Sequence, residues 1–334
     1  MCAAFSTGTP TPDNPDHIPV LLTEVIQALA PKAEGVYLDG TFGAGGYTTA
    51  ILESAPCVVW CIDRDPETLQ RGEALAERFP ARVNLVQGRF GDMADLLASR
   101  GITGVDGVAL DLGVSSMQID DRSRGFSFLR DGPLDMRMEK SGRSAADVVN
   151  TLSEKELSDI IFTYGEERHA RRVARAIVEA RRDRPFSRTL RLADVIRAEV
   201  RRAQDGIDPA TRTFQALRIY VNDELGELER GLHGAEKMLR PGGILAVVSF
   251  HSLEDRIVKT FLKARSGSAI RPSRHTPASL GAPTAAATFK PLSRRPIGPS
   301  ETEIAHNPRA RSARLRIAER TSAPSLTTVQ GGLA

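Results

Sequence analysis

Short apolar runs and helical stretches alternate along the first third of the chain. Continuous hydrophobic runs predict buried strands, and the amphipathic stretches between them predict helices. The expected strands are residues 36–39, 58–63, 83–86 and 107–112, and the expected helices are 20–30, 48–53, 66–78 and 93–99. This alternation is typical of an α/β fold with a parallel sheet and right-handed crossovers.

The strand pattern stops after Gly113 and resumes near residue 244. Helical periods dominate in between, including a helix over 169–182, another over 190–202, and one that Ser153 and Glu156 cap near residue 154. We therefore expect a core formed by 1–117 and 215–334, with a helical insertion at 118–214. Within the second core segment we expect a helix over 213–239, strands at 244–250 and 313–318, and an irregular stretch at 266–308.

Composition narrows the class of protein only slightly. The chain has 334 residues, 41% of them hydrophobic, and a net charge of +3, so no global field implies a polyanionic partner. The arginines are nevertheless concentrated: residues 168–202 hold twelve against four acidic residues. Such clusters suit nucleic-acid phosphates, although they also occur on ordinary solvated faces.

The sequence gives little support for a secreted, membrane-spanning or metal-binding protein. The N-terminus has no apolar core of a signal peptide, and no apolar run is long enough to span a bilayer. Three cysteines, an odd number, favour reduced thiols and a cytoplasmic protein. The histidines and cysteines have no metal-ligand spacing, so we expect no bound metal. Because no apolar run is long enough to span a bilayer, we expect no membrane partner either.

A glycine-rich loop follows the first expected strand, as Asp39-Gly-Thr-Phe-Gly-Ala-Gly-Gly46. Glycines there allow a ligand close to the backbone. Asp63 ends the second expected strand and could accept both ribose hydroxyls of an adenosine-containing cofactor. Asp63 could instead cap the next helix, but Asp65 suits that role better. Phe90, after the third strand, either lies against an adenine or belongs to the core.

Two cofactor classes fit a glycine loop followed by an acid. NAD dehydrogenases favour a third glycine where this chain has Thr48, because their loop approaches a pyrophosphate. S-adenosylmethionine carries a sulfonium cation and no phosphate, and acids at the strand tips (Asp39 and Asp111) suit that cation. The pattern favours a methyltransferase and leaves an NAD-dependent oxidoreductase as the alternative.

Several strings, in order, resemble the RsmH/MraW family of bacterial 16S ribosomal RNA (cytosine-N4)-methyltransferases. They include His17-Ile-Pro-Val-Leu-Leu-Thr-Glu24, Asp111-Leu-Gly-Val-Ser-Ser116 and Ser249-Phe-His-Ser-Leu-Glu-Asp-Arg256. The others are the glycine loop and residues 124–128, 131–138, 164–168, 210–218 and 307–316. The resemblance covers residues 17–320, nearly the whole chain.

The resemblance implies a class I, Rossmann-like methyltransferase core with an inserted all-helical domain for substrate recognition. It also implies S-adenosyl-L-methionine as cofactor and, as substrate, the N4 of a cytidine in the decoding region of 16S ribosomal RNA. Whether the substrate is naked RNA or the small ribosomal subunit stays open. The cofactor contacts that it implies are Gly45, Gly46, Tyr47, Asp63, Phe90, Asp111 and Gln118. Tyr47 departs from the histidine usual in the family, which puts any use of an imidazole there in doubt.

An exocyclic amine is a poor nucleophile, and a hydrogen-bond acceptor helps it to lose its proton. Asp111, just after the fourth strand, is the first candidate for that acceptor, unless it serves only the cofactor. His251 is a second candidate, unless it is a structural histidine. The expected phosphate contacts are arginines of the two basic regions: Arg168, Arg171, Arg172, Arg175, Arg309, Arg311 and Arg314.

The sequence leaves a non-enzymatic ribosome-assembly factor with a degenerate methyltransferase fold as a further alternative. The intact loop, Asp63 and Asp111 speak against degeneration. A homodimer also remains open.

Overall fold

One mixed sheet forms the centre of the larger part of the molecule. The computed structural model describes residues 19–200, 206, 208–267 and 286–326. Within them the sheet has the order β3-β2-β1-β4-β5-β7-β6. Its strands are β1 (Val36–Asp39), β2 (Val58–Asp63), β3 (Val83–Gln87), β4 (Val105–Asp111), β5 (Leu239–Ser249), β6 (Phe289–Pro291) and β7 (Arg314–Arg320).

Strands β1 to β5 are parallel, and β7 pairs antiparallel with both β5 and β6. Alternate residues of the central strands belong to different hydrophobic clusters, as Tyr37 and Leu38 of β1 illustrate. The sheet is therefore buried on both faces, which explains the continuous apolar runs of the sequence. This architecture confirms the expected α/β fold with a largely parallel sheet.

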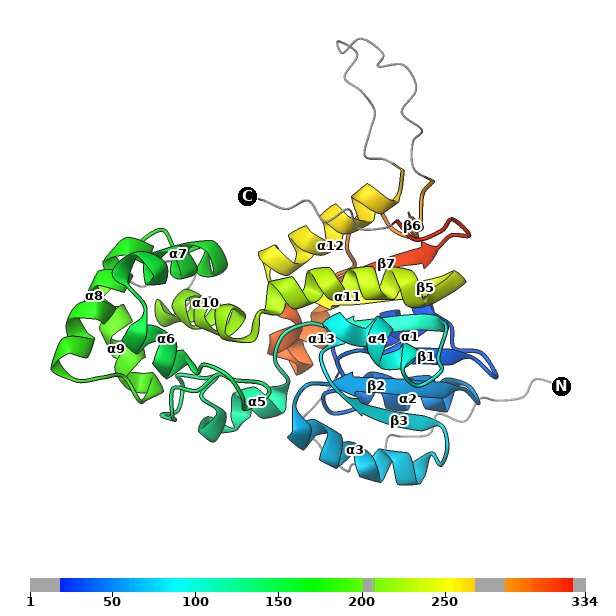
Figure 1. The fold of residues 1–334 in the computed structure, drawn as a ribbon, viewed down its shortest axis with the longest axis horizontal. Coiled ribbons are helices and arrows are strands. Elements are labelled where there is room, and N and C mark those ends of the chain that lie inside the picture. Colours follow the sequence, from blue (N-terminus) through cyan, green and yellow to red (C-terminus); the bar gives the residue numbers. More distant parts are fainter. Residues whose placement is uncertain (1–18, 201–205, 207, 268–285, 327–334) are drawn as a thin grey trace, which may run out of the picture.

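Helices cover the two faces of the sheet (Figure 1). One cluster packs against α4 (Met93–Ala98), α11 (Glu224–Met238) and α12 (Ser252–Arg265). The other packs against α1 (Leu22–Leu29) and α2 (Gly46–Ser54). Asp65 caps helix α3 (Pro66–Arg78), because its side chain accepts the Glu67 N–H, so the expected capping role of Asp65 is confirmed.

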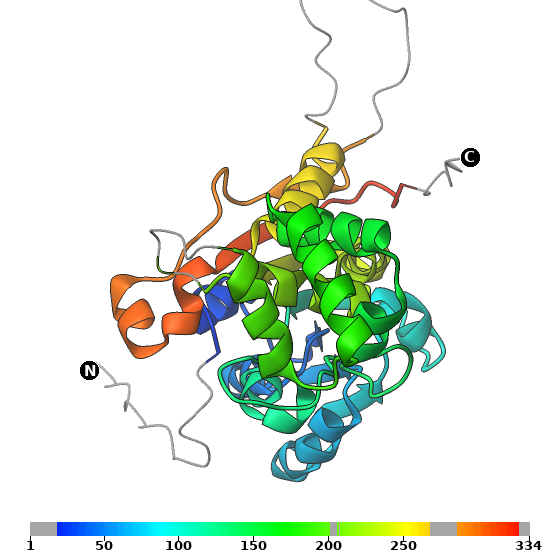
Figure 2. The same cartoon turned by 90° about the vertical axis from the view of Figure 1, so that its left-hand side faces the viewer.

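A group of helices lies beside the sheet rather than on it (Figure 1 and Figure 2). It comprises α6 (Ala145–Thr151), α7 (Glu154–Gly165), α8 (Ala170–Asp183), α9 (Thr189–Glu199) and α10 (Ala210–Asn222), with the short α5 (Ser116–Asp120) nearer the sheet. These helices share a hydrophobic cluster of their own, which includes Phe186 and Phe214. The division of the chain into domains at 118–214 stays a prediction, and its C-terminal limit lies inside α10.

The structure corrects two expectations about the elements. The single helix expected over 213–239 is wrong, because Asp223 has a left-handed φ of 51° and separates α10 from α11. The stretch 266–308 is not wholly irregular, since it contains β6 and α13 (Glu301–His306). Phe289 is fully buried, and Ser300 caps α13, so packing and capping order segments whose composition suggested loops.

Two other expectations concern cysteines and membranes. Cys57 and Cys61 are buried free thiols, while Cys2 lies outside the described residues. None of the helices that the structure describes combines the length and the apolar character that a bilayer span requires.

One buried arginine joins the end of β2 to α11 and to the end of α10. Arg64, directly after β2, lies 2.6 Å from Glu227 of α11 and donates to the Asn222 carbonyl at 2.9 Å. Arg64 is only 10% exposed and Glu227 only 1%. Burial raises the pKa of Glu227 to about 7, although the charge of Arg64 acts in the opposite direction. The pair therefore holds a carboxyl that is otherwise costly to ionise in the interior.

We expect Arg64→Met to lower the free energy of unfolding by about 3 kcal/mol, because it leaves Glu227 buried without its partner. The loss should be larger at pH 8 than at pH 5.5. An acid with a raised folded-state pKa binds more protons when folded, so its contribution to stability falls as the pH rises. Urea unfolding at both pH values measures the effect.

Arg78→Met is the matched control, because Arg78 and Glu53 form an ion pair of 2.6 Å that is about half exposed on both sides. We expect a loss below about 1 kcal/mol for this exposed pair. Equal losses in the two variants would contradict the role of the buried pair.

Candidate functional site

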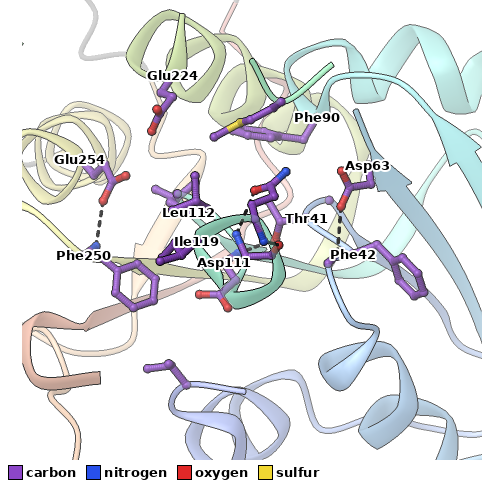
Figure 3. A pocket seen from close by; sticks show the side chains of 18 of the residues that line it. Thr41, Phe42, Asp63, Phe90, Asp111, Leu112, Ile119, Glu224, Phe250 and Glu254 are labelled. Carbon is purple, nitrogen blue, oxygen red and sulfur yellow. Dashed lines mark hydrogen bonds between the residues drawn. The ribbon is translucent and has the colours of Figure 1, made fainter. Parts of the chain in front are cut away.

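A cavity of about 390 Å³ opens where the parallel strands β1, β2 and β4 end. Loops after parallel strands meet at one edge of the sheet, which is where open α/β sheets bind ligands. Figure 3 shows Asp63 and Phe90 on one side of the cavity, Glu224 and Glu254 on the other, and Asp111 between them. The lining comes from distant parts of the chain, from Pro19 and Val20 to Asn307, Arg309 and Ser312.

The glycine loop after β1 forms one wall of this cavity. Gly43 and Gly45 both have positive φ, 53° and 76°, which side chains rarely adopt. The Gly43 N–H donates to Asp63 Oδ2 at 2.9 Å, and the Gly45 N–H donates to the Phe42 carbonyl at 2.7 Å. Helix α2 begins at Gly46 immediately after this turn, so its N-terminal amides lie at the cavity.

Asp39 lies beneath the loop rather than in the lining. It is buried and accepts from the Thr48 hydroxyl at 2.8 Å. Burial raises the pKa of Asp39 to about 6. Thr48, which stands where dinucleotide-binding loops carry glycine, therefore holds the base of the loop through its side chain.

Asp63 occupies the tip of β2 and faces the cavity. Its carboxylate already accepts the amides of Gly43 and Asp65, at 2.9 and 2.8 Å. Burial nevertheless raises its pKa to about 6, and the nearby charge of Asp65 adds to this. Hydroxyl donors from a ligand would favour the ionised form of this carboxylate.

The other expected cofactor contacts lie around the same cavity, with one exception. Phe90 and Gln118 line it, as do Gly46 and Tyr47, whereas Gly45 does not. The Tyr47 hydroxyl donates to the Val20 carbonyl, so this side chain ties α2 to the segment before α1. The Gln118 carboxamide bonds the Asp65 carboxylate and the Ser115 amide.

Asp111 lies at the end of β4, between the two sides of the cavity. Its N–H donates to Thr41 Oγ1 at 2.6 Å, which links the β4 tip to the glycine loop. Its Oδ1 is buried and has no hydrogen-bond partner among the described residues. Burial, and then the charges of Asp39 and Glu254, raise the pKa of Asp111 well above its ordinary value. A buried acceptor without a partner is costly and marks a place for a ligand donor.

His251 and Glu254 form the opposite side of the cavity, at the start of α12. Glu254 Oε2 accepts the Phe250 and His251 amides at 2.8 and 3.2 Å, and His251 Nδ1 accepts the Glu254 amide at 3.4 Å. This is a reciprocal helix cap, so His251 has the structural role that the sequence left open. Its Nε2 is 3.1 Å from Glu254 Oε1 and makes no hydrogen bond of acceptable geometry within the described residues.

Glu224 and Arg218 complete this side. Arg218 donates to both Glu224 oxygens at 2.8 Å, and both residues line the cavity. Burial opposes ionisation of Glu254, but the contact with His251 and the charges of His251 and Arg218 lower its pKa overall. Glu224 thus pairs directly with the guanidinium, while Glu254 is close enough for its charge to interact with that of Arg218.

The sequence gives no indication of a cluster of two glutamates and a histidine on this side, residue types that can bind a metal ion. Potential ligand atoms of Glu224, His251 and Glu254 lie within 4.8 Å of one another, although the linear spacing of the histidines showed nothing of the kind. Glu224 is engaged by the Arg218 guanidinium and Glu254 by backbone amides. These contacts favour an ion-pair cluster built around Arg218.

The expected phosphate contacts are dispersed. Among them only Arg309 lines the cavity, where it also pairs with Asp120 at 2.6 Å. Arg314 lies 3.3 Å from Asp255. Arg168, Arg171, Arg172 and Arg175 are exposed on or beside α8, away from the cavity lining, and Arg311 is exposed in the turn after α13. The roles of these arginines stay predictions.

Sequence reasoning also missed Thr41, Arg218 and Glu224. Thr41 acts through a hydrogen bond to a residue 70 positions away, which no local pattern reveals. Arg218 and Glu224 are six residues apart, a separation that does not face across a continuous helix. Only the break at Asp223 brings them together.

Comparisons with known proteins agree with this geometry. A family model described as the MraW methylase family matches residues 14–321. The proteins named Ribosomal RNA small subunit methyltransferase H from Paramagnetospirillum magneticum and Rhodospirillum centenum are 65% and 62% identical. The alignments cover 94% and 96% of this chain and 98% of each relative. A solved rRNA methylase from Streptococcus thermophilus is similar with a TM-score of 0.39 and 10% identity, over 90% of this chain and 92% of that one, too distant to support a conclusion.

Because the pKa of Asp63 is raised to about 6, we expect ligand binding at this carboxylate to depend on pH. A ribose bound at Asp63 would donate to the ionised carboxylate, so its affinity should be lost as the pH falls through about 6. We expect the Kd of S-adenosylhomocysteine to rise about ten-fold between pH 7.5 and pH 5. Asp63→Asn should weaken binding at pH 7.5 by about ten-fold or more and remove the pH dependence.

Isothermal titration calorimetry at both pH values measures this. Asp106→Asn is the control, because Asp106 lies on the same sheet but pairs with Lys32 and Arg240 outside the cavity. An unchanged pH dependence in Asp63→Asn would show that another group binds the ligand.

Proposed function

The chain belongs to the MraW methylase family, and from that premise we propose that it methylates the exocyclic N4 of a cytidine in the decoding region of 16S ribosomal RNA, with S-adenosylmethionine as donor. The relatives named as ribosomal RNA small subunit methyltransferases support the substrate class. The observation that carries the proposal is the unpartnered Asp111 Oδ1, buried between the two sides of one cavity. Membership of a methylase family removes the dehydrogenase alternative.

The residues on one side of the cavity fit the proposed cofactor. Asp63 is a carboxylate acceptor for the ribose hydroxyls, and Phe90 offers an apolar ring nearby. The first amides of α2, at Gly46 and Tyr47, are free of helical partners by their position. When bound, S-adenosylmethionine supplies an electrophilic methyl group on a positively charged sulfur.

Asp111 suits the role of acceptor for the amine of the base. A positive charge nearby favours the ionised form of a carboxyl whose burial has raised its pKa. The carboxylate then accepts an N4 hydrogen, which helps the nitrogen to direct its lone pair at the methyl group and finally to lose its proton. The Thr41 hydroxyl holds the Asp111 backbone, so the carboxyl is fixed in place before the substrate arrives.

His251 has a secondary part in this proposal. Its ring caps α12, and its unbonded Nε2 borders the cavity beside Glu254. The pair contributes a polar wall next to the amine rather than the first proton acceptor.

We propose residues 118–214 as the part that recognises the RNA, together with the basic C-terminal segment. Arg168, Arg171, Arg172 and Arg175 present positive charge from one exposed face of the helical group. Arg309 brings a guanidinium to the cavity itself. Contacts of this type orient a backbone without reading sequence, which suits recognition of a folded ribosomal site by shape.

Asp111→Asn tests the chemistry. We expect kcat to fall at least about 100-fold, because the carboxamide cannot take the proton. The Kd of S-adenosylhomocysteine should stay within about three-fold, since other residues hold the cofactor. In the wild-type protein the rate should fall as the pH drops through the raised pKa of Asp111. This acidic limb of the pH–rate profile should be absent in the variant.

Small subunits from a strain without the modification are the substrate, and nucleoside mass spectrometry identifies the product. Asp106→Asn, at the other end of β4, is the matched control and should keep the wild-type rate. A methylated nucleoside other than N4-methylcytidine would refute the assigned base. Subunit binding without any methyl transfer would favour the assembly-factor alternative.

A further inference from the structure

We propose that Arg218 recognises the ring edge of the target base, by donating hydrogen bonds to N3 and O2 of cytosine, and that Glu224 positions it for this. The inference rests on the proposed function and names the residue that selects the base. It concerns the side of the cavity opposite Asp63, which the proposed cofactor contacts do not use.

The break between α10 and α11 creates the Arg218–Glu224 pair. Asp223 adopts φ 51° and ψ 40°, so α11 starts in a new direction with Glu224 as its first residue. Arg218 Nε and Nη2 each donate to one Glu224 oxygen at 2.8 Å. This two-bond geometry fixes the plane of the guanidinium more firmly than a single contact does.

The ion pair leaves part of the guanidinium unused. Its two bonds engage Nε and Nη2, and Arg218 Nη1 makes no hydrogen bond to any residue that the structure describes. The side chain of Arg218 is 18% exposed and that of Glu224 8%, and both residues line the cavity. A charged donor in this setting favours a ligand acceptor, because water has little access to it.

Arg218 also lies next to the loop that carries Asp111. Its Nη2 is 3.9 Å from the position that a Cβ of Gly113 would occupy. Gly113 follows Asp111 by two residues and has a φ of 100°. The guanidinium therefore lies beside the loop that follows Asp111, and both residues line the same cavity from two different elements.

This combination of donor and acceptor matches one edge of cytosine. Its N4 amine is a donor, and the neighbouring N3 and O2 are both acceptors. An acceptor at Asp111 and donors at Arg218 pair with that order. Adenine also has an amine beside a ring acceptor, but it carries C2–H where cytosine has O2, so it leaves one donor of Arg218 without a partner. An unpaired buried donor is a strong means of discrimination.

The carboxylate of the cofactor is the other acceptor that Arg218 could bind. Local charge favours the base, because Glu224 and Glu254 flank the single positive charge of Arg218. An anionic carboxylate would meet net negative charge there, whereas a neutral base with carbonyl character would not. The experiment separates the two ligands.

Arg218→Met and Arg218→Lys are the test variants, with Arg230→Met as matched control. Arg230 pairs with Asp223 at 2.9 Å near the same helix junction and does not line the cavity. We expect kcat/KM on undermodified small subunits to fall about 100-fold in Arg218→Met and about ten-fold in Arg218→Lys, which keeps the charge but not the planar fork. Arg230→Met should keep the wild-type value, and the Kd of S-adenosylhomocysteine should stay within two-fold in all three.

A binding experiment independent of catalysis uses saturation-transfer NMR with S-adenosylhomocysteine present. The probes are CMP, AMP and the monophosphate of pyrimidin-2-one riboside, which lacks the amine but keeps N3 and O2. We expect the wild-type protein to bind CMP and the pyrimidinone over AMP, and both Arg218 variants to lose this preference. Glu224→Gln should reduce the preference while S-adenosylhomocysteine binding stays unchanged, a pattern that a merely structural role would not produce.

Parallel losses of S-adenosylhomocysteine and base binding would assign Arg218 to the cofactor and overturn the inference. Unchanged base preference in Arg218→Lys, with normal methylation, would also overturn it. If the wild-type protein forms no N4-methylcytidine but its preference for CMP depends on Arg218, the proposed function fails while the base contact stands. Arg218→Lys keeps the test decisive if Arg218→Met does not fold.

Discussion

The Asp63 carboxylate accepts the Gly43 amide at 2.9 Å, and the Thr41 hydroxyl accepts the Asp111 amide at 2.6 Å. These two hydrogen bonds join the tips of β2, β1 and β4. They hold the glycine loop at the strand ends, where its residues form one wall of the cavity. The groups that make the bonds also line the cavity, and loss of one would alter both the shape of the site and its chemistry.

Burial of several acids around one space gives the site its electrostatic character. Burial raises the pKa values of Asp39 and Asp63 to about 6, and it raises the pKa of Asp111 well above its ordinary value. Ionising all of them together is unfavourable unless a positive charge is present. On the other side Arg218 provides a permanent positive charge, and Glu254 has a lowered pKa. The cavity thus suits a positively charged methyl donor on the side of Asp63. On the side of Arg218 it suits a neutral methyl acceptor that forms hydrogen bonds.

Contacts at the junction of α10 and α11 fix the position of the helical group relative to the site. Arg64 bonds both the last residue of α10, Asn222, and the buried Glu227 of α11. Asn222 in turn bonds the Met136 and Met138 backbone, so the segment before α6 is fixed at the same place. A substrate bound to the helices, as we propose, would thereby have a defined position relative to Asp111.

Local sequence was enough to identify the parallel strands, the glycine loop, Asp63 at a strand tip and the cap at Asp65, because each depends on residues close in the chain. The α/β class and the methyltransferase-type core followed from them. Tertiary structure alone decided that α10 and α11 are separate, that Arg218 meets Glu224, and that Thr41 binds the Asp111 backbone. It also moved Asp39 beneath the loop and made His251 a helix cap. The reason is physical: periodicity and spacing record contacts within a turn or a strand, whereas a cavity is formed by loops that meet only after the sheet has assembled.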